Sequence, residues 1–194
     1  AAQDLKKVTL ELGGKSPNIV FGDADVETAI AGAANAIFFN HGQCCCAGSR
    51  LYVEQNIFDD IVNGVAEAAR SIKVGEGFAP DTQMGPLVSE EQLNRVSGYL
   101  DSGFAEGAEA ICGGKRAGGS GYFVEPTVLV KTNAKMKVVQ EEIFGPVVTA
   151  MPFKSAEDIT PIANDTVYGL AAGIWTRDTS KAHRAAAPLR AGTI

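Results

Sequence analysis

The sequence predicts an α/β domain in three layers, with a mostly parallel sheet covered by helices on both faces. Strand-like and helix-like segments alternate along the 194 residues, an order typical of parallel strands joined by crossover helices. Several helix-like segments carry apolar residues on one face, as expected of helices packed on a sheet. The composition, 45% hydrophobic and 21% charged, is that of a globular chain able to bury one sizeable core.

In the first part of the chain, short apolar segments alternate with two amphipathic ones. Strands are predicted over residues 8–12, 19–21 and 51–54. In residues 26–38 apolar side chains recur at offsets of 3, 4, 7, 8, 11 and 12, which predicts a helix with one buried face. Asp23 or Asp25 can cap this helix. A second helix is expected to begin after a cap at Asn56 and to stop at Gly75.

The second part of the chain continues this pattern after an irregular segment. Residues 75–88 contain three glycines and two prolines and are predicted to form a surface loop. A third helix begins at Ser89, whose spacing to Gln92 is that of a capping box. Further strands are predicted over residues 108–112, 122–131, 147–153 and 170–176, and further helices from residue 155 and over residues 179–189.

The charge pattern excludes some classes of partner. Lys and Arg number 17 against 23 Asp and Glu, and the net charge of -6 includes no basic stripe, so neither nucleic acid nor an anionic membrane is expected to bind. No apolar stretch approaches the ~20 residues of a membrane span. The four cysteines have no disulfide pattern and no secretory signal precedes them, so a cytoplasmic location is expected.

Three adjacent cysteines, Cys44, Cys45 and Cys46, follow the first predicted helix and a turn at Gly42. They lack the C-x₂₋₄-C spacing of zinc sites, so no metal site is predicted. Consecutive side chains cannot all point into one pocket, so at most one or two of these thiols face a site. A thiolate is a strong nucleophile near neutral pH, which favours nucleophilic chemistry. The alternative is that all three are small buried apolar side chains.

Glu11 and His41 are the candidate partners of a nucleophilic thiol. Burial of Glu11 in the strand-like VTLEL would raise its pKa toward the range of a general base, whereas an outward-facing Glu11 would have no such role. His41 lies four positions before Cys45 and could form the Cys–His dyad of a hydrolase or acyltransferase, although a loop histidine explains it more simply. A non-catalytic structural protein is the third alternative.

Three longer motifs resemble those of the NAD(P)-dependent aldehyde dehydrogenase superfamily. LELGGKSP at 10–17 is similar to its glutamate signature, and FFNHGQCCCAGS at 38–49 is similar to its cysteine signature. The block EEIFGPVV at 141–148 resembles a third conserved segment of that family. The two signatures occur in the family's order, with Glu11 and Cys45 separated by 34 positions (45 − 11), and the likeness extends over the whole chain.

This resemblance implies a reaction and its residues. An aldehyde would be oxidised to a carboxylic acid, with Cys45 as the nucleophile that forms a thiohemiacetal and then a thioester. Glu11 would activate the water that hydrolyses the thioester, and NAD or NADP would accept the hydride. The cofactor contacts implied by the family pattern are Glu142, Phe144, Leu12, Gly13 and Gln92. The capping box is an equally good explanation of Gln92.

The resemblance also implies that residues 1–194 are a truncated catalytic domain. The chain begins without Met and ends on the strand-like AGTI, so it is expected to be a piece of a longer polypeptide. The family's NAD-binding domain, which holds most of the cofactor, and its C-terminal segment would then lie outside these residues. The longer protein is expected to be a homodimer or homotetramer, and the isolated chain is expected to oxidise no aldehyde.

Overall fold

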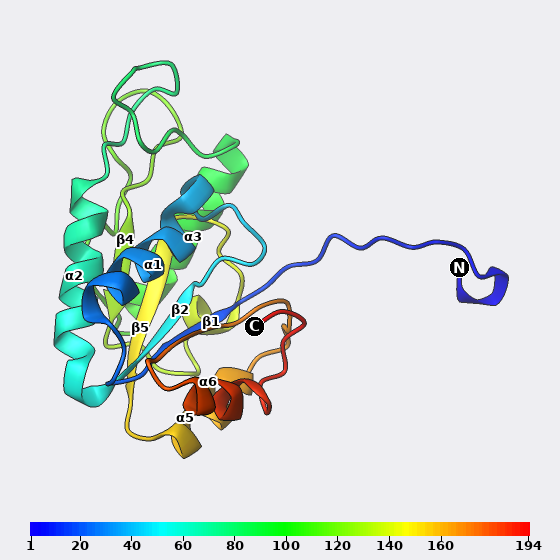
Figure 1. Cartoon of the computed structure of the whole chain (residues 1–194). Coiled ribbons are helices and arrows are strands. Elements are labelled where there is room, and N and C mark those ends of the chain that lie inside the picture. Colours follow the sequence, from blue (N-terminus) through cyan, green and yellow to red (C-terminus); the bar gives the residue numbers. More distant parts are fainter.

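In the computed structural model, which describes all residues 1–194, a six-stranded sheet lies between two layers of helices (Figure 1). The strands follow the order β3-β4-β5-β2-β1-β6. All neighbouring strands are parallel except β3 and β4, which are antiparallel. The strands are β1 (Pro17–Val20), β2 (Arg50–Glu54), β3 (Glu109–Cys112), β4 (Thr127–Val130), β5 (Val147–Phe153) and β6 (Gly173–Trp175). The predicted three-layer α/β architecture with a mostly parallel sheet is confirmed.

Six α-helices and three short 3₁₀ turns connect these strands. The α-helices are α1 (Val26–Phe38), α2 (Phe58–Ser71), α3 (Glu90–Ala105), α4 (Lys137–Gln140), α5 (Ala156–Asn164) and α6 (Thr179–Ala186). The 3₁₀ turns are η1 (Ala2–Asp4), η2 (Phe39–Gly42) and η3 (Gln55–Ile57). None of these helices combines the length and the apolar character that crossing a bilayer would require.

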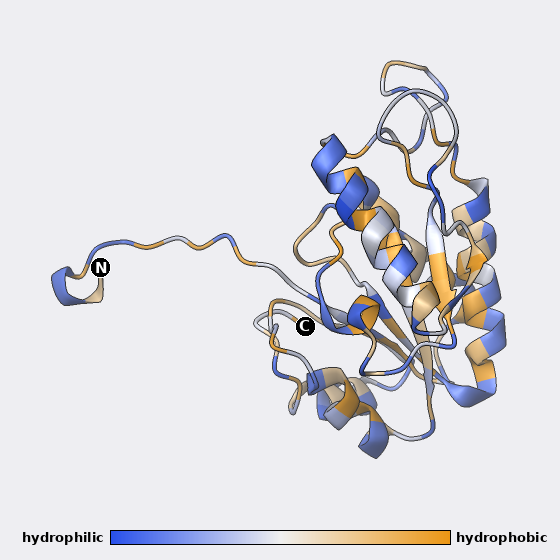
Figure 2. Ribbon diagram, turned by 180° about the vertical axis from the view of Figure 1, so that it is seen from behind, coloured by the Kyte–Doolittle hydropathy of each residue, from blue (hydrophilic) through white to orange (hydrophobic).

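The sheet separates two apolar cores, because successive side chains of a strand point to opposite faces. In β2, Leu51 and Val53 pack with α1 and α2, whereas Tyr52 points into the other core with α3 to α6. In β5, Val148 packs on the first side and Met151 on the second. Both cores are therefore continuous with the sheet, and Figure 2 shows hydrophobic strands inside helices whose outer faces are hydrophilic.

Side-chain caps fix where several helices begin. Asp25 accepts a hydrogen bond from the Thr28 amide at 3.0 Å and so caps α1, as predicted. Ser89 accepts one from the Gln92 amide at 3.2 Å and caps α3. The predicted cap at Asn56 is wrong, because η3 occupies this position and α2 begins at Phe58 without a side-chain cap.

The predicted strand over residues 8–12 is also wrong. These residues pair with no strand and belong to an exposed arm, residues 1–12, that extends away from the body of the molecule (Figure 1). Val8, Leu10 and Leu12 are 57%, 70% and 58% exposed. Their β-forming side chains favour an extended backbone, but a strand also needs a neighbour to hydrogen-bond, and the chain supplies none here.

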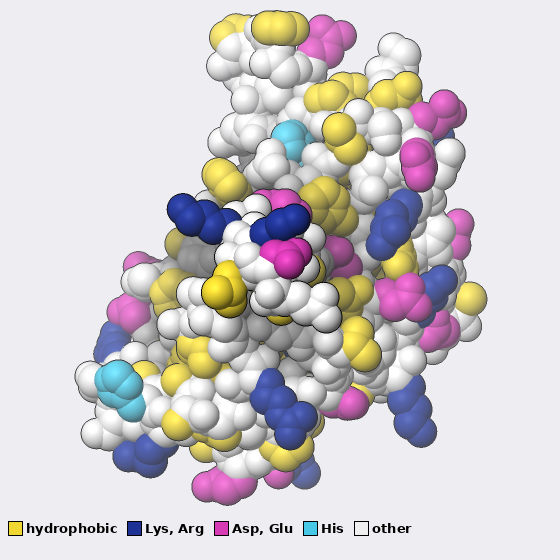
Figure 3. Space-filling model, turned by 90° about the vertical axis from the view of Figure 1, so that its right-hand side faces the viewer, with side chains coloured by type: hydrophobic (Ala, Val, Ile, Leu, Met, Phe, Trp, Pro, Cys, Tyr) yellow, Lys and Arg dark blue, Asp and Glu magenta, His cyan; other side chains and the backbone are white.

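Figure 3 views the molecule from the side toward which the arm extends. Acidic and basic side chains are interspersed over this face, and apolar side chains lie between them in small groups. Charges of both signs are therefore mixed on this face.

Candidate active site

The three cysteines belong to a loop, residues 43–49, whose direction is set by a left-handed turn after α1. Asn40, His41 and Gly42 have φ of 49°, 62° and 66°, so three consecutive residues adopt the left-handed conformation. Asn and His adopt it more readily than most side chains, and Gly adopts it freely. At Gly42 a Cβ atom would lie only 2.1 Å from the carbonyl oxygen of Gly145, so the close approach of these two loops requires glycine.

The thiols of this loop differ in their surroundings. Cys44 and Cys45 are half-buried and Cys46 is exposed. The sulfur atoms of Cys44 and Cys46 lie 3.4 Å apart, and this hydrogen bond, followed by burial, raises the pKa of Cys46. Cys45 forms no thiol hydrogen bond, and its backbone N–H has no acceptor within the chain. Cys45 is therefore the one thiol of the three that forms no hydrogen bond with a neighbouring sulfur.

Gly13 and Gly14, at the end of the arm, bring the segment 10–17 into contact with the segments 38–49 and 141–148. The Gly14 amide donates to Oε1 of Glu142 at 3.2 Å. A Cβ atom on Gly13 would lie 2.5 Å from Oε2 of Glu142, and one on Gly14 would lie 2.3 Å from the carbonyl oxygen of Cys45. The backbone at Gly13-Gly14 thus lies directly between the Glu142 carboxylate and the cysteine loop. At Gly14 the neighbour is a backbone oxygen that cannot rotate away, so this position requires glycine.

A narrow cavity lies where these segments meet. Its walls come from Gly14, from Cys44 and Ser49 of the cysteine loop, and from Glu142 and Phe144. Two predicted cofactor residues, Glu142 and Phe144, are therefore beside the thiol loop, although they are about a hundred positions away in the sequence. Gly13 contacts this group through Glu142.

The structure does not bring the Glu11 carboxylate to Cys45. Glu11 and Leu12 lie on the exposed arm, and neither lines the cavity beside Cys44. The backbone of Gly14 contacts Cys45. Glu11 is three residues before Gly14, so about 10 Å of extended chain separates Glu11 from Gly14. The catalytic role of Glu11 and the cofactor contact of Leu12 stay predictions.

Gln92 lies in the first turn of α3 and reaches back to the loop that carries Phe144. Its Nε2 donates to the carbonyl oxygens of Ile143 at 3.1 Å and Phe144 at 2.6 Å. Ser89 caps the Gln92 amide, so half of the predicted capping box is present, but the glutamine side chain does not return to Ser89. The predicted contact of Gln92 with a ribose is untested by these hydrogen bonds.

His41 has a structural partner rather than a thiol partner. Its Nε2 accepts a hydrogen bond from the Gly85 amide at 2.9 Å, and nearby Gln43 accepts one from the Val88 amide at 3.0 Å. These bonds attach the irregular segment 75–88 to the residues just before the cysteines. Since Nε2 is an acceptor, Nδ1 carries the proton of the neutral ring, and this buried atom has no partner. The arrangement argues against a Cys–His dyad.

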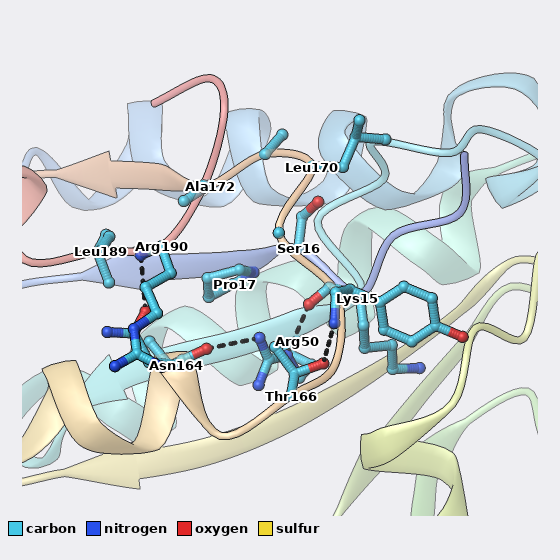
Figure 4. Close-up of a pocket in the computed structure, with 15 residues that line it drawn as sticks. Lys15, Ser16, Pro17, Arg50, Asn164, Thr166, Leu170, Ala172, Leu189 and Arg190 are labelled. Atoms are coloured by element: carbon cyan, nitrogen blue, oxygen red, sulfur yellow. Dashed lines mark hydrogen bonds between the residues drawn. The ribbon is translucent and has the colours of Figure 1, made fainter. Parts of the chain in front are cut away.

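Two buried basic side chains that the sequence reasoning missed, Lys15 and Arg50, line a second pocket, whose walls also include Asn164 and Leu189 (Figure 4). Lys15 and Arg50 are each 1% exposed. Arg50 donates to the carbonyl oxygens of Lys15 at 2.7 Å and Ala163 at 2.8 Å, and to the Tyr52 hydroxyl at 3.1 Å. No carboxylate binds either group. The only signal in the sequence is a basic residue near the beginning of each of two central strands, Lys15 two positions before β1 and Arg50 as the first residue of β2.

Burial dominates the electrostatics of this pair. Burial, followed by the neighbouring Arg50 charge, lowers the pKa of Lys15 to about 7, against the attraction of Glu142 and Glu141, which raises it. The Lys15 Nζ has no hydrogen-bond partner. Burial also lowers the pKa of Arg50, whose guanidinium nevertheless stays charged. Lys15 is thus a buried amine that titrates near neutral pH. No cluster of three His, Cys, Asp or Glu residues could hold a metal ion.

Comparisons with known proteins agree with this arrangement. The family model described as "Aldehyde dehydrogenase family" matches residues 1–194. An aldehyde dehydrogenase of Aspergillus niger is 54% identical over all of this chain, and the chain covers 39% of that relative. A betaine aldehyde dehydrogenase of Bacillus subtilis is 48% identical, with 40% of its length covered.

Solved structures give the same result. The NAD+ complex of aldehyde dehydrogenase from Bacillus cereus superposes with a TM-score of 0.95 at 49% identity. That superposition covers 99% of this chain and 39% of the solved chain. The sequence described above therefore spans about two fifths of the length of the proteins it matches. On the match of sequence and structure along its whole length, this chain belongs to the aldehyde dehydrogenase family.

Proposed function

We propose that these residues are the catalytic part of a longer enzyme that oxidises an aldehyde to a carboxylic acid with NAD+ or NADP+. The observation that supports this most directly is the meeting of Gly14, Cys45 and Glu142 at one place. A nucleophile and a candidate cofactor ligand then flank the same short backbone segment. We further propose a cytoplasmic enzyme that acts as a homodimer or homotetramer and whose dinucleotide is held mainly by residues outside this chain.

In this proposal the Cys45 thiolate attacks the aldehyde carbon, and a C–S bond forms as the carbonyl oxygen becomes an oxyanion. The free backbone N–H of Cys45 is available to donate to this oxyanion. A bound dinucleotide would supply the acceptor for the hydride that leaves the thiohemiacetal carbon as the Cys45 thioester forms. Glu11 then takes a proton from water, the hydroxide attacks the thioester, and the Cys45 thiolate leaves as the acid forms.

The residues present fit a dinucleotide at one point. Glu142 has one carboxylate oxygen bonded to the Gly14 amide and a second oxygen against Gly13, so the group is oriented before any ligand arrives. An oriented carboxylate is a suitable acceptor for ribose hydroxyls. Phe144, next to it on the same loop, can pack against the nicotinamide, and Gly13 and Leu12 can lie beside that ring.

The test is steady-state kinetics of the longer polypeptide with a panel of aldehydes and both dinucleotides. Wild-type protein should reduce NAD+ or NADP+ in proportion to aldehyde consumed. Cys45→Ser should lower kcat by more than about a thousandfold. The matched variants Cys44→Ser and Cys46→Ser should retain most of the activity. Equal losses in all three, or no dinucleotide reduction by the wild type, would contradict the proposal.

Glu11 is tested by the pre-steady state. Glu11→Gln should still reduce about one equivalent of dinucleotide per site, because the thioester forms, and then stall, because its hydrolysis lacks a base. A full steady-state rate without a burst would remove Glu11 from the mechanism. The 194 residues by themselves are expected to show no dinucleotide-dependent turnover.

A further inference from the structure

Three polar side chains on one face of α3 hold the loop that follows α4. Gln92, Arg95 and Tyr99 are spaced by three and four positions, so they lie along one side of the helix. All three reach the loop of residues 141–146, which carries Glu142 and Phe144. Arg95 donates to the carbonyl oxygen of Glu142 at 2.8 Å, and the Tyr99 hydroxyl donates to the Glu141 carboxylate at 2.8 Å.

The loop depends on these side chains because its own backbone bonds are few. It lies between the end of α4 and the start of β5, outside every helix and strand. The carbonyl oxygens of Glu142, Ile143 and Phe144 accept no backbone hydrogen bond, and all three are bound by Gln92 or Arg95. The only donors to three consecutive carbonyls are therefore on one helix.

The loop also contains strain that must be balanced. Phe144 has a φ of 59°, a left-handed conformation that is unfavourable for an aromatic residue. Its carbonyl receives the shortest of the bonds from α3, the 2.6 Å bond from Gln92. Next to it, Gly145 packs so closely on Val96 of α3 that a Cβ would lie 2.5 Å from a Val96 methyl group. Strain is thus located where α3 contacts the loop most tightly.

The chemistry of Tyr99 suits a permanent donor. Burial, followed by the hydrogen bond to Glu141, raises the pKa of Tyr99 to about 12, so the phenol keeps its proton at ordinary pH. The cationic groups of Arg95 and Lys137 lie 5.5 Å and 5.3 Å from the centre of its ring, within the range of cation–π attraction. These contacts and the burial of Tyr99 favour the ring position in which its hydroxyl reaches the loop.

We propose that Gln92, Arg95 and Tyr99 form a clamp, the α3 clamp, that positions Glu142 and Phe144 for the dinucleotide. This inference rests on the proposed function, because it assigns Glu142 and Phe144 to cofactor binding. The members of the clamp are positioning residues and act through the backbone of the 141–146 loop. In this role Gln92 serves as a hydrogen-bond donor to Phe144.

The substitution Gln92→Glu separates this role from a direct contact with ribose. A carboxylate accepts hydrogen bonds from ribose hydroxyls at least as well as an amide oxygen does. It cannot donate to the carbonyl of Phe144, and it faces that oxygen with a like charge. The clamp thus predicts weaker cofactor binding by Gln92→Glu, and a ribose contact predicts equal or tighter binding. Gln83→Glu is the matched control, because the Gln83 side chain only accepts a bond from the Lys73 amide.

The experiment compares Gln92→Glu, Arg95→Met and Tyr99→Phe in the longer polypeptide with Gln83→Glu, Arg116→Met and Tyr122→Phe. Arg116 and Tyr122 are exposed, and their side chains form no hydrogen bond or ion pair. Each clamp variant should raise the KM for the dinucleotide by about three- to tenfold and leave the KM for the aldehyde unchanged. Hydrogen exchange of residues 141–146 should become faster in the same variants, and the controls should match the wild type.

Three results would overturn the clamp. They are unchanged exchange in the 141–146 loop, faster exchange without a change in the dinucleotide KM, and tighter dinucleotide binding by Gln92→Glu. The wild-type kinetics decide the proposed function separately, since they do not depend on the variants. Hydrogen exchange reports the loop even where the enzyme performs another reaction, so the two failures are distinguishable.

Discussion

The backbone of Gly14 packs so closely on Cys45 that a Cβ atom at position 14 would lie 2.3 Å from the Cys45 carbonyl oxygen. This contact joins the end of the N-terminal arm to the cysteine loop. It is made by backbone atoms on both sides, so neither partner can move aside by rotating a side chain. The contact therefore fixes where the cysteine loop lies relative to β1.

Gly14→Ala is expected to disrupt this contact. The added methyl group must push the two backbones apart, which should cost about 1–3 kcal/mol of unfolding free energy and displace Cys45. Urea unfolding and the rate of Cys45 alkylation measure the two effects. Gly98→Ala is the control. Gly98 lies inside α3, and a Cβ atom at this position would meet nothing within 4 Å. It should stabilise the protein by up to about 1 kcal/mol. Equal stability of the two variants would contradict the prediction.

His41→Asn should release the segment 75–88 while sparing the chemistry. Asn accepts the left-handed backbone at this position but is too short to replace Nε2 as the acceptor of the Gly85 amide. The loss of one hydrogen bond should cost about 1 kcal/mol and make the segment a faster substrate for limited proteolysis. His183→Asn, at an exposed position, serves as the control. A collapse of kcat in His41→Asn alone would instead favour a Cys–His dyad.

Lys15 should make stability depend on pH. Its pKa is lowered from 10.5 to about 7 in the folded chain, so the unfolded chain binds more protons between these two values. The free energy of unfolding should therefore rise with pH over this range. Below pH 7 Lys15 is protonated in both states, so the folded chain bears the full cost of the buried charge. Lys15→Met removes the titrating group. Its stability relative to wild type should be higher by on the order of a few kcal/mol below pH 7, and this advantage should shrink as the pH approaches 10.5.

Chemical denaturation of wild type and Lys15→Met at several pH values measures this difference, and groups that titrate alike in both proteins cancel. Lys154→Met is the control, because Lys154 is exposed and forms no ion pair. A constant difference between Lys15→Met and wild type across the range would show that Lys15 is not desolvated as the structure indicates.

Cys44→Ala should activate Cys46. The hydrogen bond between their sulfurs raises the pKa of Cys46, so removing it should increase the thiolate fraction and the rate of iodoacetamide labelling several-fold at constant pH. Peptide mass spectrometry reads each cysteine separately. Cys112 is the internal reference, because burial raises its pKa and it should label slowly in both proteins. An unchanged Cys46 rate would refute the assigned cause.

The architecture could be predicted from the sequence because its cause is local periodicity. The recurrence of apolar residues in α1 matches the buried positions Ala29, Ala33, Ala34 and Ile37. The prediction of a strand over 8–12 was wrong because strand pairing is not local. The β-forming residues are present, but no neighbouring strand lies beside them. The segment 122–131 yields only Thr127–Val130 as a strand, after Pro126, which has no amide hydrogen to donate.

The site was predictable to the extent that motifs mark it. The family resemblance implies cofactor contacts for both Gly13 and Glu142, and the structure places these two residues side by side. Their cofactor role stays a prediction. The α3 clamp could not be foreseen, because the bond from Gln92 to Phe144 joins residues 52 positions apart and uses a backbone oxygen that every residue has. The buried Lys15 and Arg50 were missed for a related reason, since charged residues at the start of strands are ordinarily exposed.

The contact between Gly42 and Gly145 has a mechanical consequence. It joins the left-handed turn before the cysteines to the loop that carries Phe144. Neither glycine has a side chain whose rotation could accommodate a movement of the other loop. Neither loop can shift without displacing the other. The proposed nucleophile Cys45 and the proposed cofactor ligand Phe144 therefore share one rigid frame, so a motion of either loop would carry the other along in the same step.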